Sequence, residues 1–266
     1  MKMLLIPMFI SFEQIDIYSP WVILFLVVAG FITGIINTIA GSGSIINYTA
    51  FTLLGLPAGV ANGTMRLGVV MQTLASSLYF LKHKKLAVRT GLIMGVPIIL
   101  GTILGALLAA EINEKYFERI IAVVMVLLLG TLFFKPEKWI QGQAEKVKEK
   151  PTYFQLFIYF IIGIYGGFIH IGVGIFMLAA MVLISGYDLV IANGLKVFTV
   201  FLYTPFAILI FSLEGQMNLY FGLISAVGNL AGGIVASKMA VHKGAGFIRW
   251  FLIVVIVLFI LNLILK

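Results

Sequence analysis

Long apolar runs separated by short polar stretches make up most of this chain. Eight runs of about 20 residues are each long enough to cross the roughly 30 Å hydrocarbon core of a bilayer as a helix. They cover residues 20–40, 62–81, 88–110, 117–134, 153–171, 195–213, 218–240 and 247–265. Two shorter apolar runs, 45–55 and 175–186, follow the first and the fifth long runs. The pattern predicts an all-α integral membrane protein with eight long and two short helical segments.

A constant interval relates the two sides of a polar linker at 135–152. Gly43 and Gly174 each end a Gly-x-Gly step, and they lie 131 residues apart. The same interval carries the Ala-Asn-Gly triplet at 61–63 onto an identical triplet at 192–194. It also pairs Gly55 with Gly186, Gly91 with Gly222 and Gly101 with Gly232. An interval that holds through a whole triplet predicts an internal repeat.

Loop charge predicts that the two halves are inverted. The loop at 82–85 is strongly basic, whereas its equivalent at 214–218 has no basic residue. The next pair of loops reverses this order, because 111–115 leans acidic and its equivalent, at 238–249, is basic. Lys and Arg concentrate in cytoplasmic loops, so equivalent loops are expected on opposite sides. We expect two inverted repeats, each of four long helices plus one short, broken half-helix, with both termini outside.

The predicted organisation is an N-terminal extension (1–19), a first transmembrane repeat (20–134), a cytoplasmic linker (135–152) and a second repeat (153–266). Only 11% of the residues are charged, against about 25% in a soluble domain. The net charge of +8 is assigned to inside-facing loops and not to nucleic-acid binding. The sequence has no cysteine, which excludes disulfides and thiolate chemistry. We expect a multi-pass protein of the cell (inner or plasma) membrane.

The Gly-x-Gly steps at 41–43 and 172–174 are the best candidates for breaks within helices, because a shortened apolar run follows each. Hydrocarbon cannot satisfy the backbone groups that a break leaves unpaired, so a break lies beside protein or a water-filled cavity. Transporters often hold substrate at such breaks, and a helix N-terminus favours anions. The alternative is that these glycines only allow close packing. Packing is the favoured interpretation for Gly30, Gly34, Gly163 and Gly167.

Two cations, Arg66 and Lys196, lie inside apolar runs. A charge at a helix centre costs roughly 2.5–3.5 kcal/mol on insertion scales, so one that persists usually has a function. The alternative is that both lie near a helix start and extend to the headgroups. Asn62 and Asn193 could donate to a substrate or cap the helices that follow, and His170 could contact substrate, carry a proton or serve packing. The candidate substrate-binding residues are Ser42, Gly43, Ser44, Asn62, Arg66, His170, Gly172, Gly174, Asn193 and Lys196.

Acidic residues lie at the ends of the apolar runs, in the linker or in the N-terminal extension, and none lies near the middle of a run. A cation pathway or a carboxylate proton relay normally needs one there, so the interior suits an anion. Ser42 does not belong to a Gly-x-Ser-x-Gly elbow, because Ala40 takes the first glycine position. We expect no enzymatic activity, no catalytic residue, no metal site and no cofactor.

The motifs of both halves resemble the sulfite exporter TauE/SafE family in order and spacing. The resemblance rests on 40–44, 54–57 and 61–66 in the first half and on 163–168, 172–174 and 192–197 in the second. It covers nearly the whole chain apart from the N-terminus and the linker. Ser42 and Ser44 depart from it, because many members carry further glycines there. The resemblance implies a permease for sulfur-containing anions such as sulfite and organosulfonates.

The expected function is therefore secondary transport, most simply export, of such an anion held between the two glycine-rich breaks. The alternative is a passive anion channel or a permease for a different small anion. The implied partners are a small anionic substrate and the lipid bilayer. Nucleic acid is not expected, and assembly into a homo-oligomer is left open.

Overall fold

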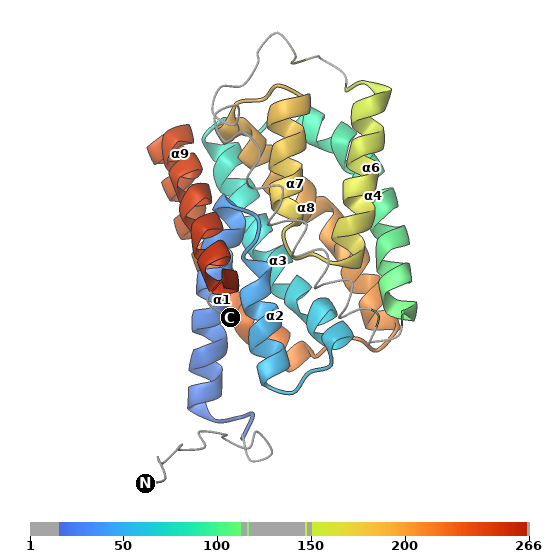
Figure 1. Cartoon of the computed structure of the whole chain (residues 1–266), viewed down its shortest axis with the longest axis vertical. Helices are drawn as coiled ribbons and strands as arrows, with labels where there is room; N and C mark the ends of the chain where they lie inside the picture. Colours follow the sequence, from blue (N-terminus) through green and yellow to red (C-terminus); the bar gives the residue numbers. More distant parts are fainter. Residues whose placement is uncertain (1–15, 113–115, 117–146, 148–150, 265–266) are drawn as a thin grey trace.

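The computed structural model describes residues 16–112, 116, 147 and 151–264, with side chains up to residue 254 in the last helix. This part of the chain is all helical, with eight α-helices and one π-helical segment (Figure 1). The elements are α1 (Pro20–Ile39), α2 (Ser44–Leu53), α3 (Ala58–Lys82), α4 (Val88–Glu111), α6 (Tyr153–Phe168), α7 (Val173–Ala179), η4 (Ala180–Ile184), α8 (Leu189–Leu213) and α9 (Leu219–Ile264).

The helices follow the predicted apolar runs, but α3 and α8 begin earlier than predicted. Helix α3 starts at Ala58 and not at 62, and α8 starts at Leu189 and not at 195. The side chain of Asp188 caps α8 by accepting hydrogen bonds from the N–H groups of Val190 and Ile191. Pro57 has the fixed φ of its ring, −53°, and precedes the first turn of α3. The predicted run at 117–134 lies outside the described residues.

Both predicted helix breaks are confirmed. Helix α1 ends at Ile39, and Gly41 then takes a φ of +83° before α2 begins at Ser44. Helix α6 ends at Phe168, and Gly172 takes a φ of +77° before α7 begins. Glycine is the residue that adopts this left-handed backbone without steric cost.

The last helix is also divided by a glycine. Gly244, with φ 71° and ψ −166°, separates α9 into 219–243 and 245–264. These two pieces correspond to the predicted runs at 218–240 and 247–265.

The interval of 131 residues seen in the sequence also relates helix bounds. It carries both ends of α3, at 58 and 82, onto both ends of α8, at 189 and 213. It also pairs Lys84 with Gly215, whose φ angles are +55° and +66° at the ends of the turns that follow these helices. Two segments of unrelated composition thus form the same helix and the same terminal turn.

Helices from the two sides of the linker pack against each other through glycines. Helix α1 packs on α9, and α4 packs on α6 (Figure 1). A Cβ added at Gly34 would lie 2.4 Å from the carbonyl oxygen of Asn229, and one at Gly167 would lie 2.2 Å from that of Thr102. Equivalent approaches occur at Gly30 and Gly163. The packing function predicted for these four glycines is therefore confirmed.

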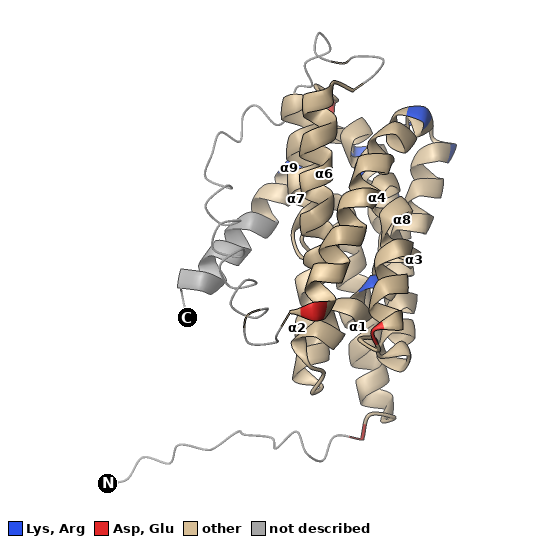
Figure 2. Ribbon diagram, turned by 90° about the vertical axis from the view of Figure 1, so that its right-hand side faces the viewer, with Lys and Arg blue, Asp and Glu red and all other residues tan. Residues whose placement is uncertain are grey.

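The bundle is apolar outside and polar inside. Leu100 in α4 and Leu209 in α8 are more than half exposed, whereas Gln72 and Asn229 are almost fully buried. Among the described helices, four are long and apolar enough to cross a membrane: α1, α4, α8 and residues 219–254 of α9. Helix α3 has the length but carries buried polar residues, and α6 has only 16 residues because it stops at the second break. Charged residues lie mostly at the ends of the bundle (Figure 2).

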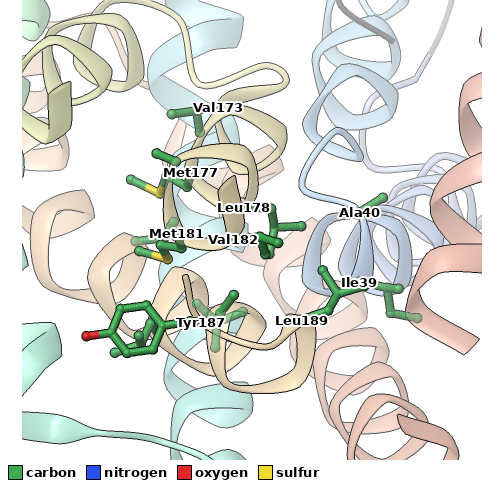
Figure 3. Close-up of a cluster of buried hydrophobic side chains, with 14 of the residues drawn as sticks. Ile39, Ala40, Val173, Met177, Leu178, Met181, Val182, Tyr187 and Leu189 are labelled. Carbon is green, nitrogen blue, oxygen red and sulfur yellow. The ribbon is translucent and has the colours of Figure 1, made fainter. Parts of the chain in front are cut away.

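A hydrophobic cluster holds the two breaks together. Ile39 and Ala40, at the end of α1, belong to the same buried cluster as Val173 and Leu178 of α7 and Leu189 of α8 (Figure 3). Burial of such side chains contributes about 25 cal/mol per Å² of apolar surface removed from water or from a loosely packed state. This cluster fixes the end of α1 close to the start of α7, where the candidate site lies.

Candidate functional site

The two helix breaks touch each other at the centre of the bundle. The N–H of Gly174 donates a hydrogen bond of 3.2 Å to the carbonyl oxygen of Gly41. A Cβ added at either glycine would lie 2.4 Å from the Cα of the other. Only glycines allow this approach, so the two breaks, which are far apart in sequence, form one structure.

A cavity lies beside this contact. It encloses about 220 Å³ of space not filled by atoms. The residues that line it are Asn37, Gly41, Gln72, Thr73, His170, Val173, Gly174, Lys196, Val197 and Val200. One of these side chains is cationic, and none is acidic. The cavity can therefore offer hydrogen-bond donors and positive charge to a small ligand.

Lys196 reaches the cavity from α8 and caps the broken end of α1. Its Nζ donates hydrogen bonds to the carbonyl oxygens of Asn37, at 3.2 Å, and Thr38, at 2.7 Å. A cation at a helix C-terminus is favoured by the helix dipole and satisfies carbonyls that lack a partner. The ammonium group has three N–H donors, and these two bonds leave one of them for the cavity.

Arg66 performs the corresponding function for α6. Its Nη1 donates to the carbonyl oxygen of Gly166 at 3.0 Å, and its Nη2 donates to that of Gly167 at 2.6 Å. Asn62, one turn earlier in α3, donates to the carbonyl oxygen of Phe168 at 3.0 Å. The three carbonyls are the last of α6, so α3 closes the C-terminal end of that helix. Arg66 does not line the cavity.

Two of the alternatives left open by the sequence do not hold. Arg66 and Lys196 are 0% and 1% exposed inside the bundle, so neither side chain extends to the headgroups. Asn62 and Asn193 do not cap helices, because α3 and α8 begin four residues before them.

His170 lies between the second break and the cavity. It is 1% exposed, and its Nδ1 lies 3.0 Å from the hydroxyl of Tyr203, which is also buried. Either atom can be the donor, depending on the imidazole tautomer. The histidine is thus fixed by a hydrogen bond while one face of it lines the cavity.

The remaining candidate residues are buried near the breaks but do not line the cavity. The hydroxyl groups of Ser42 and Ser44 have no hydrogen-bond partner among the described residues, and neither does either amide atom of Asn193. The structure therefore brings His170, Gly174 and Lys196 together at the cavity. The candidates outside its lining are Ser42, Gly43, Ser44, Asn62, Arg66, Gly172 and Asn193.

Sequence reasoning missed three polar residues of the cavity: Asn37, Gln72 and Thr73. All three are neutral, so a search for buried charges passes over them. Gln72 and Thr73 lie near the middle of an apolar run, and Asn37 lies near the end of another. A polar side chain at such a position is itself a signal, because hydrocarbon offers it no partner.

A helical bundle with an apolar exterior, a polar interior and helices broken around a central cavity is the architecture of a multi-pass membrane transporter. The family profile described as "Sulfite exporter TauE/SafE" matches residues 26–263. The chain therefore belongs to the TauE/SafE family, whose members are membrane transporters and not enzymes.

Curated relatives carry names of the same kind. A "Probable membrane transporter protein" of Haemophilus influenzae is 29% identical over 83% of this chain and 86% of its own length. A "Probable membrane transporter protein ORF9" of Sinorhizobium sp is 28% identical over 87% of this chain and 88% of its own. The Escherichia coli K12 "Probable membrane transporter protein YfcA" is 23% identical over 92% and 90%. No solved structure gives a significant match.

Proposed function

We propose that this protein is a secondary transporter that exports a small sulfur-containing anion, such as sulfite or an organosulfonate. The single observation that carries the proposal is the cavity at the meeting of the two breaks, which contains Lys196 and no acidic side chain. The family description names sulfite export. An anion in a membrane interior needs a counter-charge and hydrogen-bond donors, and this cavity has both.

Lys196 supplies the positive charge. Its ammonium uses two donors on α1 and keeps one for the anion. Gln72 offers an amide within the same cavity, and its Oε1 has no hydrogen-bond partner among the described residues. Arg66 adds positive charge from the end of α6 and holds that end in place. The anion thus lies between one cation that contacts it and a second that positions the break.

The two halves act as inverted repeats. The shared interval of the helix bounds and of the terminal turns supports a repeat. Inversion is supported by the ends at which equivalent turns lie. His83, after α3, has its ring 5.8 Å from that of His242 in α9, whereas Gln216, after α8, donates to the carbonyl oxygen of Ala110 in α4. Equivalent turns thus meet different ends of their partner helices.

The end that contains His83 and His242 is the cytoplasmic end. Lys82, Lys84, Lys85 and Lys243 lie beside these histidines in the sequence, and such clusters mark cytoplasmic loops. The cavity is then reached alternately from the two sides as the contact between Gly41 and Gly174 opens and closes. Inverted-repeat transporters work by this kind of alternating access.

The test is flux of labelled sulfite in liposomes that contain the purified full chain. A carrier gives uptake that saturates with sulfite and accelerates when the liposomes are preloaded with unlabelled sulfite. Competition by an organosulfonate and none by a small organic cation is the expected selectivity. Uptake that rises without saturation and ignores preloading would instead identify a passive channel.

A sodium-free version of the same assay tests the coupling. Since no acidic side chain lines the cavity, the expected flux persists when sodium is replaced by choline. A strict sodium requirement would contradict an anion site of this composition.

A further inference from the structure

Three buried polar side chains at the first break lack partners for their hydrogen-bonding groups. Ser42 is 6% exposed, and Ser44 and Asn47 are fully buried. The hydroxyl oxygens of both serines and the Nδ2 of Asn47 have no hydrogen-bond partner among the described residues. A buried polar group without a partner destabilises the fold, and native proteins keep few of them. Three in one place therefore require a reason.

The orientation of Asn47 leaves its donor group free. Thr33 of α1 donates a hydrogen bond of 3.1 Å to Asn47 Oδ1. Because the carbonyl end of the amide is engaged, the two N–H donors of its NH₂ end remain available. Ser44 and Asn47 are three residues apart and lie on the same face of α2. This face thus presents a hydroxyl and an amide donor side by side.

The equivalent positions at the second break are apolar and well packed. The interval of 131 residues relates Ser42 to Val173, Ser44 to Ile175 and Asn47 to Leu178. All three of these side chains are buried, and Val173 and Leu178 belong to the hydrophobic cluster of Figure 3. The fold therefore accepts an apolar side chain at each position, and packing does not explain the polar residues of the first break.

The surroundings of the first break favour an anion. Helix α2 has ten residues and begins at Ser44, so its N-terminus offers backbone donors and a partial positive charge. The break also adjoins the cavity. A Cβ added at Gly43 would lie 2.7 Å from the backbone nitrogen of Asn37, which lines the cavity. A ligand that enters the cavity can thus reach the donors of α2.

We propose that Ser42, Ser44 and Asn47 bind the oxygen atoms of the transported oxyanion and that the second break does not. The ligand is a small anion with several acceptor oxygens, of which a sulfite ion or a sulfonate group is an example. The apolar second break closes the cavity through the contact of Gly174 with Gly41. This inference rests on the proposed anion transport and makes the two breaks chemically distinct within that function.

The test measures sulfite binding to the purified full chain by calorimetry. Asn47→Leu gives this position the side chain that its equivalent, Leu178, already carries, and Ser44→Ala removes only a hydroxyl. Both substitutions are expected to weaken sulfite affinity at least about tenfold without lowering the midpoint of thermal unfolding. The matched control is Ser77→Ala, which removes another buried, unpartnered hydroxyl in α3. Its sulfite affinity is expected to equal that of the unmodified protein.

The outcomes separate this inference from the proposed function. If the unmodified protein binds sulfite and both variants bind it equally well, the three side chains hold only water and the inference is overturned. If the unmodified protein does not bind sulfite or a sulfonate, the proposed function fails, and the inference fails with it. If Asn47→Leu does not fold, the smaller change Ser44→Ala decides the question alone.

Discussion

Arg66 of α3 donates a hydrogen bond of 2.6 Å from Nη2 to the backbone carbonyl oxygen of Gly167 in α6, 101 residues further along the chain. Lys196 of α8 does the same for α1, through the carbonyl oxygens of Asn37 and Thr38. Each half of the protein thus provides the cation that closes the broken helix of the other half. The two broken helices cannot separate from the central helices without exposing unpaired carbonyls and a buried charge.

Replacing Arg66 by Met is expected to lower stability as well as transport. The change removes two hydrogen bonds made by a charged group, each worth about 1.5–3 kcal/mol, and leaves the carbonyls of Gly166 and Gly167 without their donors. Arg66→Lys retains a charge and is expected to lose less. The measurement is the midpoint of thermal unfolding in detergent, followed by sulfite flux. An Arg66→Met protein as stable as the unmodified one would show that α6 ends without this cap.

Replacing Gly174 by Ala is expected to abolish transport while the helices still form. The new Cβ would lie 2.4 Å from the Cα of Gly41, so the two breaks must move apart. Overpacking of this kind costs about 1–3 kcal/mol. Gly246→Ala is the matched control, because nothing lies within 4 Å of a Cβ at that position. Flux through the two variants, at equal amounts of reconstituted protein, is compared. Normal flux through Gly174→Ala would mean that the contact between the breaks is not needed for transport.

Single cysteines are expected to report opposite sides for equivalent turns. The sequence has no cysteine, so each introduced thiol is the only one. Lys84→Cys and Lys243→Cys should react from the cytoplasmic side, and Glu214→Cys from the outside. An impermeant thiol reagent is added to intact cells and then to broken cells. Reaction of Lys84→Cys and Glu214→Cys from the same side would rule out inverted halves.

The sequence predicted the helices and the two breaks because both depend on local properties. An apolar run of about 20 residues and a Gly-x-Gly step state their structure directly. The starts of α3 and α8 were wrong, because the polar residues around Asn62 and Asn193 interrupt the apolar pattern. Asp188, which caps α8, is four residues from any predicted helical position within that run. Capping decides a helix start even where hydropathy is low.

The partners of the buried cations could not be predicted. Arg66 and Lys196 bind backbone carbonyls that lie 100 or more residues away, and a carbonyl carries no side-chain signal in the sequence. The sequence identified both cations correctly as residues inside the bundle's apolar segments. It did not separate them, although only Lys196 lines the cavity. The neutral residues Asn37 and Gln72 were missed for the same reason, since their importance depends on the tertiary contact between the breaks.

The central claim is that a sulfur oxyanion binds in the cavity beside Lys196, and calorimetry of sulfite with Lys196→Met tests it most directly. Gel filtration establishes that the variant is folded, and Lys238→Met, at an exposed position of α9, is the matched control. Loss of one hydrogen bond to a charged group is worth about 1.5–3 kcal/mol, or roughly a ten- to hundredfold loss of affinity. The account predicts this loss for Lys196→Met and none for Lys238→Met. Unchanged sulfite affinity in a well-folded Lys196→Met protein would place the anion outside this cavity.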